Sequence, residues 1–276
     1  MSIAAHLLHE RFGQDLPAHP ALDDPFLARV LGRRTCRRYK DQQVAADLVD
    51  ALLNVAFATS SKSDYQQASV IVVQDPGRRR KIAELVPAMP WIGSAPVFLV
   101  FCADANRLEM ACALRGRATQ NRNLEAFFNA AIDAALVMQT FILAAEQIGL
   151  GCCPISVIRN HLPNVRDILS LPDRVVPVAG LCVGYPAEPG HVSMRLPATL
   201  TRYIDRYDDN ALAGEIDRYD RLRAQRAPTP RDKQRSPDKF GYAELYGWSE
   251  DKSRQAEAGE GRDFAAMVGA CGFTLD

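Results

Sequence analysis

Residues 124–151, LEAFFNAAIDAALVMQTFILAAEQIGLG, form the longest helical pattern in the chain, and the other segments have to be arranged around it. Apolar side chains cover nearly the whole circumference of the predicted helix, whereas a surface helix carries a single apolar stripe. Gly149 and Gly151 are typical of a helix end, because glycine adopts the left-handed conformation without a Cβ clash. We therefore predict a buried central helix. The residues alone leave open whether its own chain covers it completely or a second subunit covers part of it.

Polar residues within this stretch argue against a membrane span. Four of them interrupt the apolar sequence and leave an apolar segment too short for a bilayer, namely Asn129, Asp133, Gln139 and Glu146. Lys plus Arg and Asp plus Glu each number 33, so no net charge attracts nucleic acid or a membrane surface. The first residues, MSIAAHLLHERFGQ, lack the basic and apolar regions of a signal peptide. We expect a soluble cytoplasmic protein.

The cysteines and histidines predict no metal site. The 7 cysteines lack CxxC spacing, and the 5 histidines lack a ligand pattern such as HExxH. Most cysteines stand in apolar sequence, which favours reduced thiols in the core.

Three apolar runs flank the central stretch and are predicted strands, at residues 68–73, 95–102 and 175–183. The run at 95–102 is continuous rather than alternating, which is typical of a strand covered on both faces. Residues 152–158 are expected to be a short apolar connection. Helical patterns lie at 24–31, 44–57, 76–86, 160–169, 212–226 and 263–270, with Asp23 or Asp24 and Asn160 as expected caps. Helices alternating with apolar strands predict an α+β or α/β sheet covered by helices.

The polar composition of both ends suggests three segments. Residues 1–23 are expected to be an accessory segment, 24–207 the main domain, and 208–276 a helical C-terminal extension. Residues 227–239, APTPRDKQRSPDK, have the composition of a disordered or extended linker.

Residues 32–39, GRRTCRRY, are the first stretch that suggests chemistry. Arginine presents a planar fork of donors to phosphate oxygens, and threonine adds a hydroxyl. A solvated basic turn is the alternative. Apolar helical patterns flank the stretch in a protein without net charge, which favours a phosphate site.

A second candidate is the polar loop 58–67, ATSSKSDYQQ, which leads directly into the strand predicted at 68–73. Loops at strand ends commonly bind ligands, although an ordinary connection is the alternative. The chain lacks GxGxxG, GxxxxGK[ST] and GxSxG motifs, which disfavours Rossmann, P-loop and serine-hydrolase sites. Because no acid–base pair or nucleophile stands out, we expect a cofactor to supply the chemistry.

Five segments, in this order, resemble the nitroreductase family of FMN proteins, and most of all its NADPH-dependent flavin reductase and oxygen-insensitive nitroreductase branch. They are 33–39 (RRTCRRY), 58–66 (ATSSKSDYQ), 100–107 (VFCADANR), 144–151 with 158–160 (AAEQIGLG and IRN), and 181–187 with 195–197 (LCVGYPA and RLP). The resemblance implies an α+β fold with a helix-covered mixed β-sheet. It also implies a homodimer with FMN at the subunit interface and a C-terminal segment that wraps the other subunit.

The resemblance also implies roles for particular residues. The FMN phosphate and ribityl chain would be held by Arg33, Arg34, Thr35 and Arg37. Ser60, Ser61 and Gln66 would face the isoalloxazine ring. Arg195 would add charge near the phosphate or the substrate entrance. Hydride would pass from NADPH or NADH to flavin N5 and then to a small-molecule acceptor, so no catalytic side chain is expected.

Three departures from the family pattern bear on the substrate. The stretch that allows the backbone to approach the flavin, Tyr-Ile-Gly-Gly in this branch, is Pro154-Ile155-Ser156-Val157 here. Proline lacks an amide donor and valine adds bulk. The family's lysine is Ser193, and its Gln-Pro-Trp is Gln66-Gln67-Ala68.

Three functions follow from this comparison with the family. The first is an NAD(P)H-dependent FMN oxidoreductase that reduces nitroaromatics, quinones or flavins by a ping-pong mechanism. The second is a specialised flavoenzyme with another substrate. The third is a non-catalytic flavin-binding protein.

Overall fold

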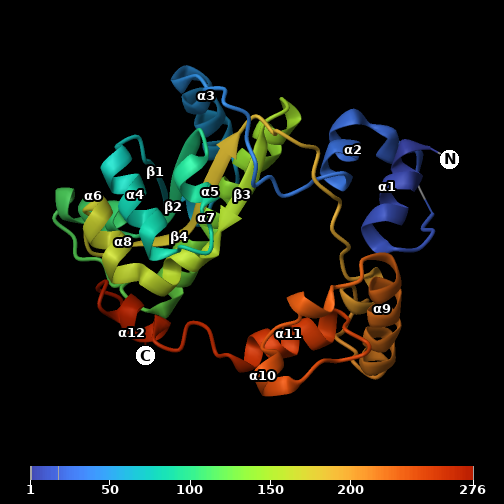
Figure 1. The fold of residues 1–276 in the computed structure, drawn as a ribbon. Coiled ribbons are helices and arrows are strands. Elements are labelled where there is room, and N and C mark those ends of the chain that lie inside the picture. The colour runs from blue at the N-terminus through green and yellow to red at the C-terminus, as the bar shows by residue number, and fades with distance from the viewer. Residues whose placement is uncertain (1, 18, 276) are drawn as a thin grey trace. The chain divides into compact units, whose positions relative to one another are not determined.

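The computed structural model describes residues 2–17 and 19–275, which form two compact units (Figure 1). Unit 1 contains Met1–Arg33 and Val192–Glu260, and unit 2 contains Arg34–His191 and Gly261–Asp276. This division differs from the expected segments 1–23, 24–207 and 208–276, because the N-terminal segment shares a unit with most of the C-terminal extension.

Unit 2 is built on a four-stranded sheet in the order β1-β2-β4-β3. The three predicted strands are confirmed as β1 (Ala68–Val72), β2 (Val97–Asp104) and β4 (Val175–Gly184). The expected connection after the central helix is instead a fourth strand, β3 (Gly151–Ile155), which pairs with β4. The α+β class is confirmed, but every pairing in this sheet is antiparallel, so the expected mixed sheet was wrong in this detail. The mixed sheet was expected from the family resemblance, and the four strands of this chain pair only in antiparallel fashion.

Helices cover both faces of this sheet. On one face α3 (Ala46–Phe57) and α7 (Leu124–Gln147) pack on the strands, with Phe101 and Phe141 edge to face at 6.0 Å between ring centroids. On the other face lie α4 (Pro76–Leu85), α5 (Trp91–Ser94) and α8 (Leu162–Leu169). The remaining helices of the unit are α6 (Asn106–Leu114) and α12 (Phe264–Gly269). The cap expected at Asn160 was wrong, because Ser156–His161 form a 3-10 helix, η3, and α8 starts after it.

The central helix α7 is not covered on all sides by its own chain. Ala134, Val137 and Phe141 are buried against the sheet. Four apolar side chains at every fourth position are exposed, at 50%, 60%, 41% and 39% for Leu124, Phe128, Ile132 and Leu136. By length and composition α7 would also suit a membrane span. Its packing against the sheet is that of a core helix in a globular unit.

Unit 1 consists of helices and turns. Its elements are α1 (Ile3–Phe12), η1 (Pro20–Asp23), α2 (Pro25–Leu31), η4 (Ala198–Leu200), α9 (Leu212–Arg226), η5 (Arg231–Lys233), α10 (Pro237–Phe240) and α11 (Trp248–Glu257). The predicted cap of α2 is confirmed, since the Asp24 carboxylate accepts the amides of Phe26 and Leu27.

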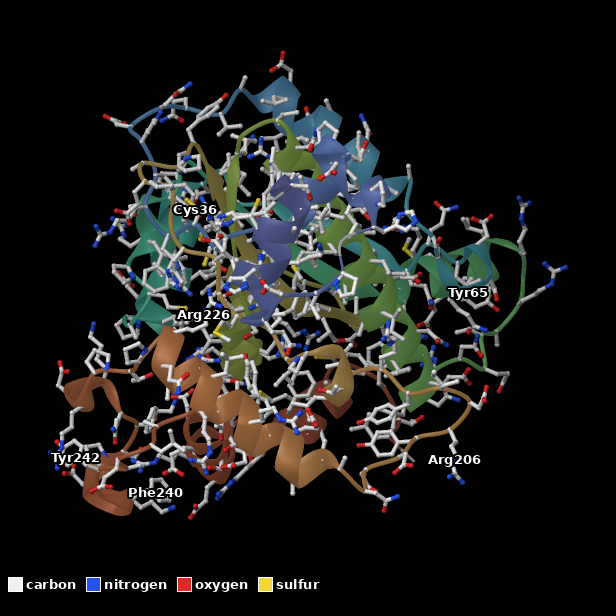
Figure 2. All side chains as sticks on the ribbon, turned by 90° about the vertical axis from the view of Figure 1, so that its right-hand side faces the viewer. Cys36, Tyr65, Arg206, Arg226, Phe240 and Tyr242 are labelled. Atoms are coloured by element: carbon white, nitrogen blue, oxygen red, sulfur yellow. The ribbon has the colours of Figure 1, made fainter. Side chains whose placement is uncertain are left out.

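The expected linker 227–239 includes η5 and the start of α10 in unit 1, and polar side chains hold it to the residues that follow. The Gln234 amide both donates to and accepts from the Ala243 backbone at 2.9 Å. Arg254, 4% exposed, donates to the carbonyls of Arg235 and Gly241 and stacks on the ring of Phe240, labelled in Figure 2. The structure thus has short helices and bonded polar groups where the composition suggested a disordered or extended linker.

Candidate functional site

The polar loop 58–67 has a strained backbone. It follows α3 and contains a 3-10 turn, η2 (Lys62–Asp64). Ser63, Asp64 and Gln66 have φ values of 50°, 57° and 52°, in the left-handed region that residues other than glycine adopt at a cost. Such a conformation persists only when surrounding contacts impose it.

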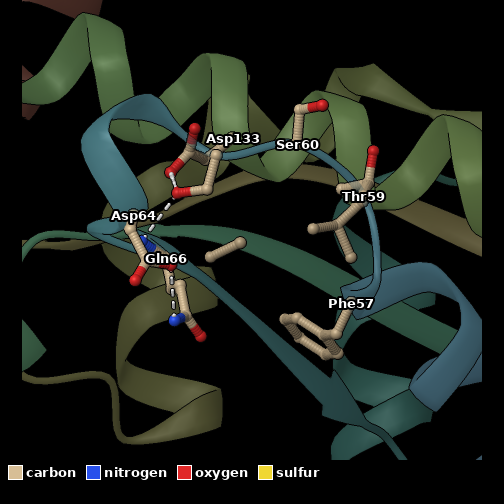
Figure 3. A pocket seen from close by; sticks show the side chains of 9 residues that line it. Phe57, Thr59, Ser60, Asp64, Gln66 and Asp133 are labelled. Carbon is tan, nitrogen blue, oxygen red and sulfur yellow. Dashed lines mark hydrogen bonds between the residues drawn. The ribbon is translucent and has the colours of Figure 1, made fainter.

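Asp133 of α7 supplies those contacts. Its side chain is 2% exposed and lies under the loop (Figure 3). Oδ2 accepts hydrogen bonds from Ser61 Oγ at 2.9 Å and from the Gln67 amide at 3.0 Å, while Oδ1 accepts the Lys62 amide at 3.0 Å. A buried carboxylate is tolerated when donors satisfy it, and here all three donors come from the loop. Asp133 therefore fixes the loop to the central helix.

A second anchor comes from Arg107 of α6. Its guanidinium donates to the Gln66 carbonyl at 2.5 Å, to the Ala68 carbonyl at 3.1 Å and to Ser69 Oγ at 2.7 Å. It also forms an ion pair with Asp104 at 3.1 Å. The loop is therefore held at its end as well as at its centre.

The loop encloses a hollow of about 270 Å³ (Figure 3). Its lining includes three of the predicted site residues, Ser60, Ser61 and Gln66, so the structure brings these together. The rest of the lining is Phe57, Thr59, Asp64, Ala68, Asp133 and Val137. The Gln66 side-chain amide donates to Asp64 at 3.0 Å across the loop. The hollow thus combines hydroxyls, one side-chain amide and two carboxylates with apolar side chains.

The arginine-rich segment runs beside the sheet of unit 2. The Cys36 amide donates to the Cys152 carbonyl at 3.0 Å, and the Lys40 amide donates to the Tyr185 backbone carbonyl at 2.8 Å. The Tyr39 hydroxyl lies 2.7 Å from the Cys36 carbonyl and 3.2 Å from that of Cys182. Burial raises the pKa of Tyr39 well above its ordinary value, so this hydroxyl stays protonated as a donor. The segment is therefore fixed at the sheet edge formed by β3 and β4.

Three predicted phosphate ligands lie on this fixed segment. Arg34 is half-buried, and its Nη1 donates to the Pro189 carbonyl at 3.4 Å. Its buried Nε has no hydrogen-bond partner among the residues that the structure describes. Thr35 is half-buried and Arg37 is exposed, with the Arg37 guanidinium 5.5 Å from the ring centroid of Trp91. Stacking on an aromatic face holds a guanidinium in place while its edge donors remain available.

A family comparison agrees with these elements. The model of the nitroreductase family matches residues 30–185. This chain belongs to the nitroreductase family. The match includes the arginine segment from Val30 onward, the loop 58–67, and all four strands of unit 2.

Individual relatives and solved structures agree with the family assignment. The chain is 37% identical over 190 residues to an FMN reductase [NAD(P)H] of Bacillus subtilis, covering 68% of this chain and 76% of the relative. It is 34% identical over 206 residues to an oxygen-insensitive NADPH nitroreductase of Salmonella typhimurium, covering 73% of this chain and 82% of the relative. The solved structure of the hypothetical oxidoreductase YcnD from Bacillus subtilis superposes with a TM-score of 0.82 at 30% identity, covering 92% of this chain and 99% of the other.

The family segment Pro154–Val157 lies where β3 passes into η3. Pro154 and Ser156 are exposed, whereas Ile155 is 1% exposed and packs into the core. Ile155 therefore presents almost no surface to a ligand, and the backbone of Pro154 has a carbonyl but no amide donor.

Arg33, the fourth residue predicted to hold the FMN phosphate and ribityl chain, belongs to unit 1. So does Arg195, which was predicted to lie near the phosphate or the substrate entrance. The exposed Arg195 donates to Ser193 Oγ at 2.7 Å and to the Met194 carbonyl at 3.2 Å. Ser193, which replaces the lysine of the family branch, is thus a direct partner of Arg195.

Sequence reasoning missed that Asp133 and Arg107 hold the loop 58–67. Asp133 was noted only as an interruption of an apolar helix, and Arg107 only as part of a family motif. An aspartate inside an apolar helix is itself a signal, because a buried carboxylate requires donors from elsewhere in the chain.

Proposed function

We propose that this member of the nitroreductase family is an FMN-dependent oxidoreductase that takes electrons from NAD(P)H and reduces nitroaromatics, quinones or flavins in a ping-pong cycle. The observation that carries the proposal is the hollow of the loop 58–67, in which Ser60, Ser61 and Gln66 gather over Asp133. The names of the relatives, an FMN reductase and an NADPH nitroreductase, support it.

The donors present suit both ends of FMN. An exposed guanidinium at Arg37 and the unpartnered, buried Nε of Arg34 are suited to an anionic group such as a phosphate. The polar hollow of the loop suits the hydrogen-bonding edge of an isoalloxazine ring. When bound, FMN would accept hydride from NAD(P)H and pass two electrons to the acceptor. The protein's contribution is then to bind and orient the cofactor and its partners.

The two serines of the loop have different parts in this proposal. The Ser61 hydroxyl already donates to Asp133 and accepts the Gln66 amide at 2.7 Å, so it shapes the loop. Ser60 is exposed on the hollow and is the hydroxyl offered to the ring, together with the side chain of Gln66.

The proposal includes a homodimer. The stripe formed by Leu124, Phe128, Ile132 and Leu136 of α7 is apolar, exposed and regularly spaced, as in a helix that packs against a second helix. A second copy of this chain is its proposed partner. We also propose a cytoplasmic location, which the seven free cysteines support because thiols stay reduced in that compartment.

The first test is the visible absorption spectrum of the purified protein before and after anaerobic NADPH. We expect a bound-flavin spectrum that bleaches on reduction. A protein that remains colourless and does not bind added FMN would contradict the proposal. The double variant Arg33→Ala and Arg37→Ala is expected to lose flavin stoichiometry, and full retention would contradict the role of these arginines.

A specialised substrate is the second candidate, and the segment 154–157 favours it. Pro154 has no amide to offer and Val157 adds bulk where the family branch has glycine. Steady-state assays with nitrofurazone and quinones distinguish a specialised substrate from the nitroaromatics and quinones of the first proposal. Negligible turnover by protein whose FMN is reduced by NADPH would favour the specialised substrate. Bound FMN that neither NADPH nor NADH reduces would instead favour a non-catalytic flavin-binding protein.

A further inference from the structure

Arg11 is a buried arginine outside the residues that the family model matches. It lies in the last turn of α1 and is 6% exposed, whereas the match begins at Val30. Its guanidinium donates to backbone carbonyls through all three nitrogens. Nε and Nη2 donate to the Leu31 carbonyl at 3.1 and 2.7 Å. Nη2 also donates to the Arg33 carbonyl at 2.6 Å, and Nη1 donates to the Ser193 carbonyl at 2.7 Å.

These acceptors lie on two segments that are far apart in sequence. The first ends α2 and leads into Arg33, and the second leads into Arg195. The backbone adds a further bond, since the Arg195 amide donates to the Arg11 carbonyl at 2.8 Å. Arg11 therefore joins, within unit 1, the segment that carries Arg33 and the segment that carries Arg195.

The packing around α1 fixes this arrangement further. Gly13 ends the helix with φ of 73°, and a Cβ placed there would lie 2.6 Å from Met194 Cε and 2.7 Å from Leu222 Cδ2. The end of α1 is therefore pressed closely against the segment that contains Ser193 and Arg195. A left-handed glycine is needed here both for the turn and for the space.

We propose that Arg11 is a positioning residue for the cofactor phosphate, holding Arg33 and Arg195 in the relative placement that binds it. This rests on the FMN site proposed above. The planar fork of arginine can reach three carbonyls on two segments, whereas the single ammonium of lysine cannot span them.

The test compares FMN with riboflavin, which is the same ring without the phosphate. Apoprotein of the wild type, Arg11→Gln and Arg11→Lys is titrated with each compound by flavin fluorescence. We expect both variants to bind FMN about 10- to 100-fold more weakly, as for the loss of hydrogen bonds to a charged group, with riboflavin affinity changed less than about two-fold. Arg29→Ala, an exposed arginine on α2, is the matched control and is expected to bind both as the wild type does.

The possible results separate a positioning role from other roles. Equal losses for FMN and riboflavin would show a purely structural role and overturn the proposal. Full FMN binding by Arg11→Lys would show that charge alone matters and would also overturn it. Wild-type protein that does not bind FMN would instead overturn the proposed function, before any variant is compared.

A double-variant cycle adds a second measurement that does not depend on Arg11→Gln folding well. Arg11→Lys and Arg195→Ala are combined, and the ratio of FMN to riboflavin affinity is measured for each. If Arg11 acts through Arg195, the effect of Arg11→Lys on that ratio shrinks in the Arg195→Ala background. Simple additivity of the two effects would overturn the role through Arg195.

Discussion

At the scale of single residues, the carboxylate of Asp133 is a main determinant of the shape of the loop 58–67. Three non-glycine residues adopt left-handed backbone conformations there, and Asp133 receives three hydrogen bonds from the same loop. The hydrogen bonds to Asp133 offset the strain of the left-handed backbone conformations. Such compensation is common where a binding site is held in an otherwise unfavourable conformation. The hollow of the loop 58–67 is therefore expected to be sensitive to a change at Asp133 even though this residue is almost fully buried.

The variant Asp133→Asn tests this dependence. The amide keeps the size of the side chain but replaces one acceptor by a donor that faces loop donors. We expect the free energy of unfolding to fall by about 2–3 kcal/mol and FMN affinity to fall by about ten-fold. Urea denaturation and flavin titration measure the two effects. Glu125→Gln, the same chemical change at an exposed position of α7, is the control. An Asp133→Asn protein with wild-type FMN affinity would show that the loop keeps its shape without the carboxylate.

At the scale of elements, local signals predicted helices better than they predicted the fourth strand or the linker. Asp24 and the pattern after it gave α2 with its cap, because that signal lies within a few residues. Cys152, Cys153 and Pro154 carried no clear strand pattern, and β3 is defined by its pairing with β4. Ser60, Ser61 and Gln66 were predicted together because their segment resembles the flavin loop of the family. Asp133 lies 72 residues from Ser61, and no local pattern could connect them.

Helix α11 offers a test of how the C-terminal part of unit 1 is held. Asp220 of α9 is 7% exposed and accepts the Ser249 amide at 3.0 Å as well as the Ser249 hydroxyl. It therefore caps α11 from another helix. We expect Asp220→Ala to lower the free energy of unfolding by about 1–2 kcal/mol, as for the loss of an N-cap. Asp217→Ala, which removes an exposed ion pair with Arg221 on the same helix, is expected to change it by less than about 0.5 kcal/mol. Equal losses in denaturant unfolding would contradict the capping role.

At the scale of the whole molecule, the sequence prediction that α7 is buried all round leads to the proposed dimer. The chain itself covers only part of the helix and leaves an apolar stripe exposed. Asp133, on another side of the same helix, holds the loop 58–67. A subunit that packs on the stripe would therefore restrain the helix that carries the loop. Dimer formation and flavin binding are expected to depend on each other.

The variant Phe128→Glu tests this coupling, because it places a charge on the most exposed member of the stripe, at 60%. We expect sedimentation velocity to show a dimer for the wild type and a monomer for the variant, since burying an unpaired carboxylate costs several kcal/mol. The variant is also expected to bind FMN more weakly, and that loss should lessen at high protein concentration if dimer formation is its cause. Leu114→Glu, at an apolar position of α6 that is 83% exposed, is the control and is expected to remain dimeric. A dimeric Phe128→Glu protein would place the interface elsewhere, whereas a monomeric variant with full FMN affinity would show that one chain suffices to bind the cofactor.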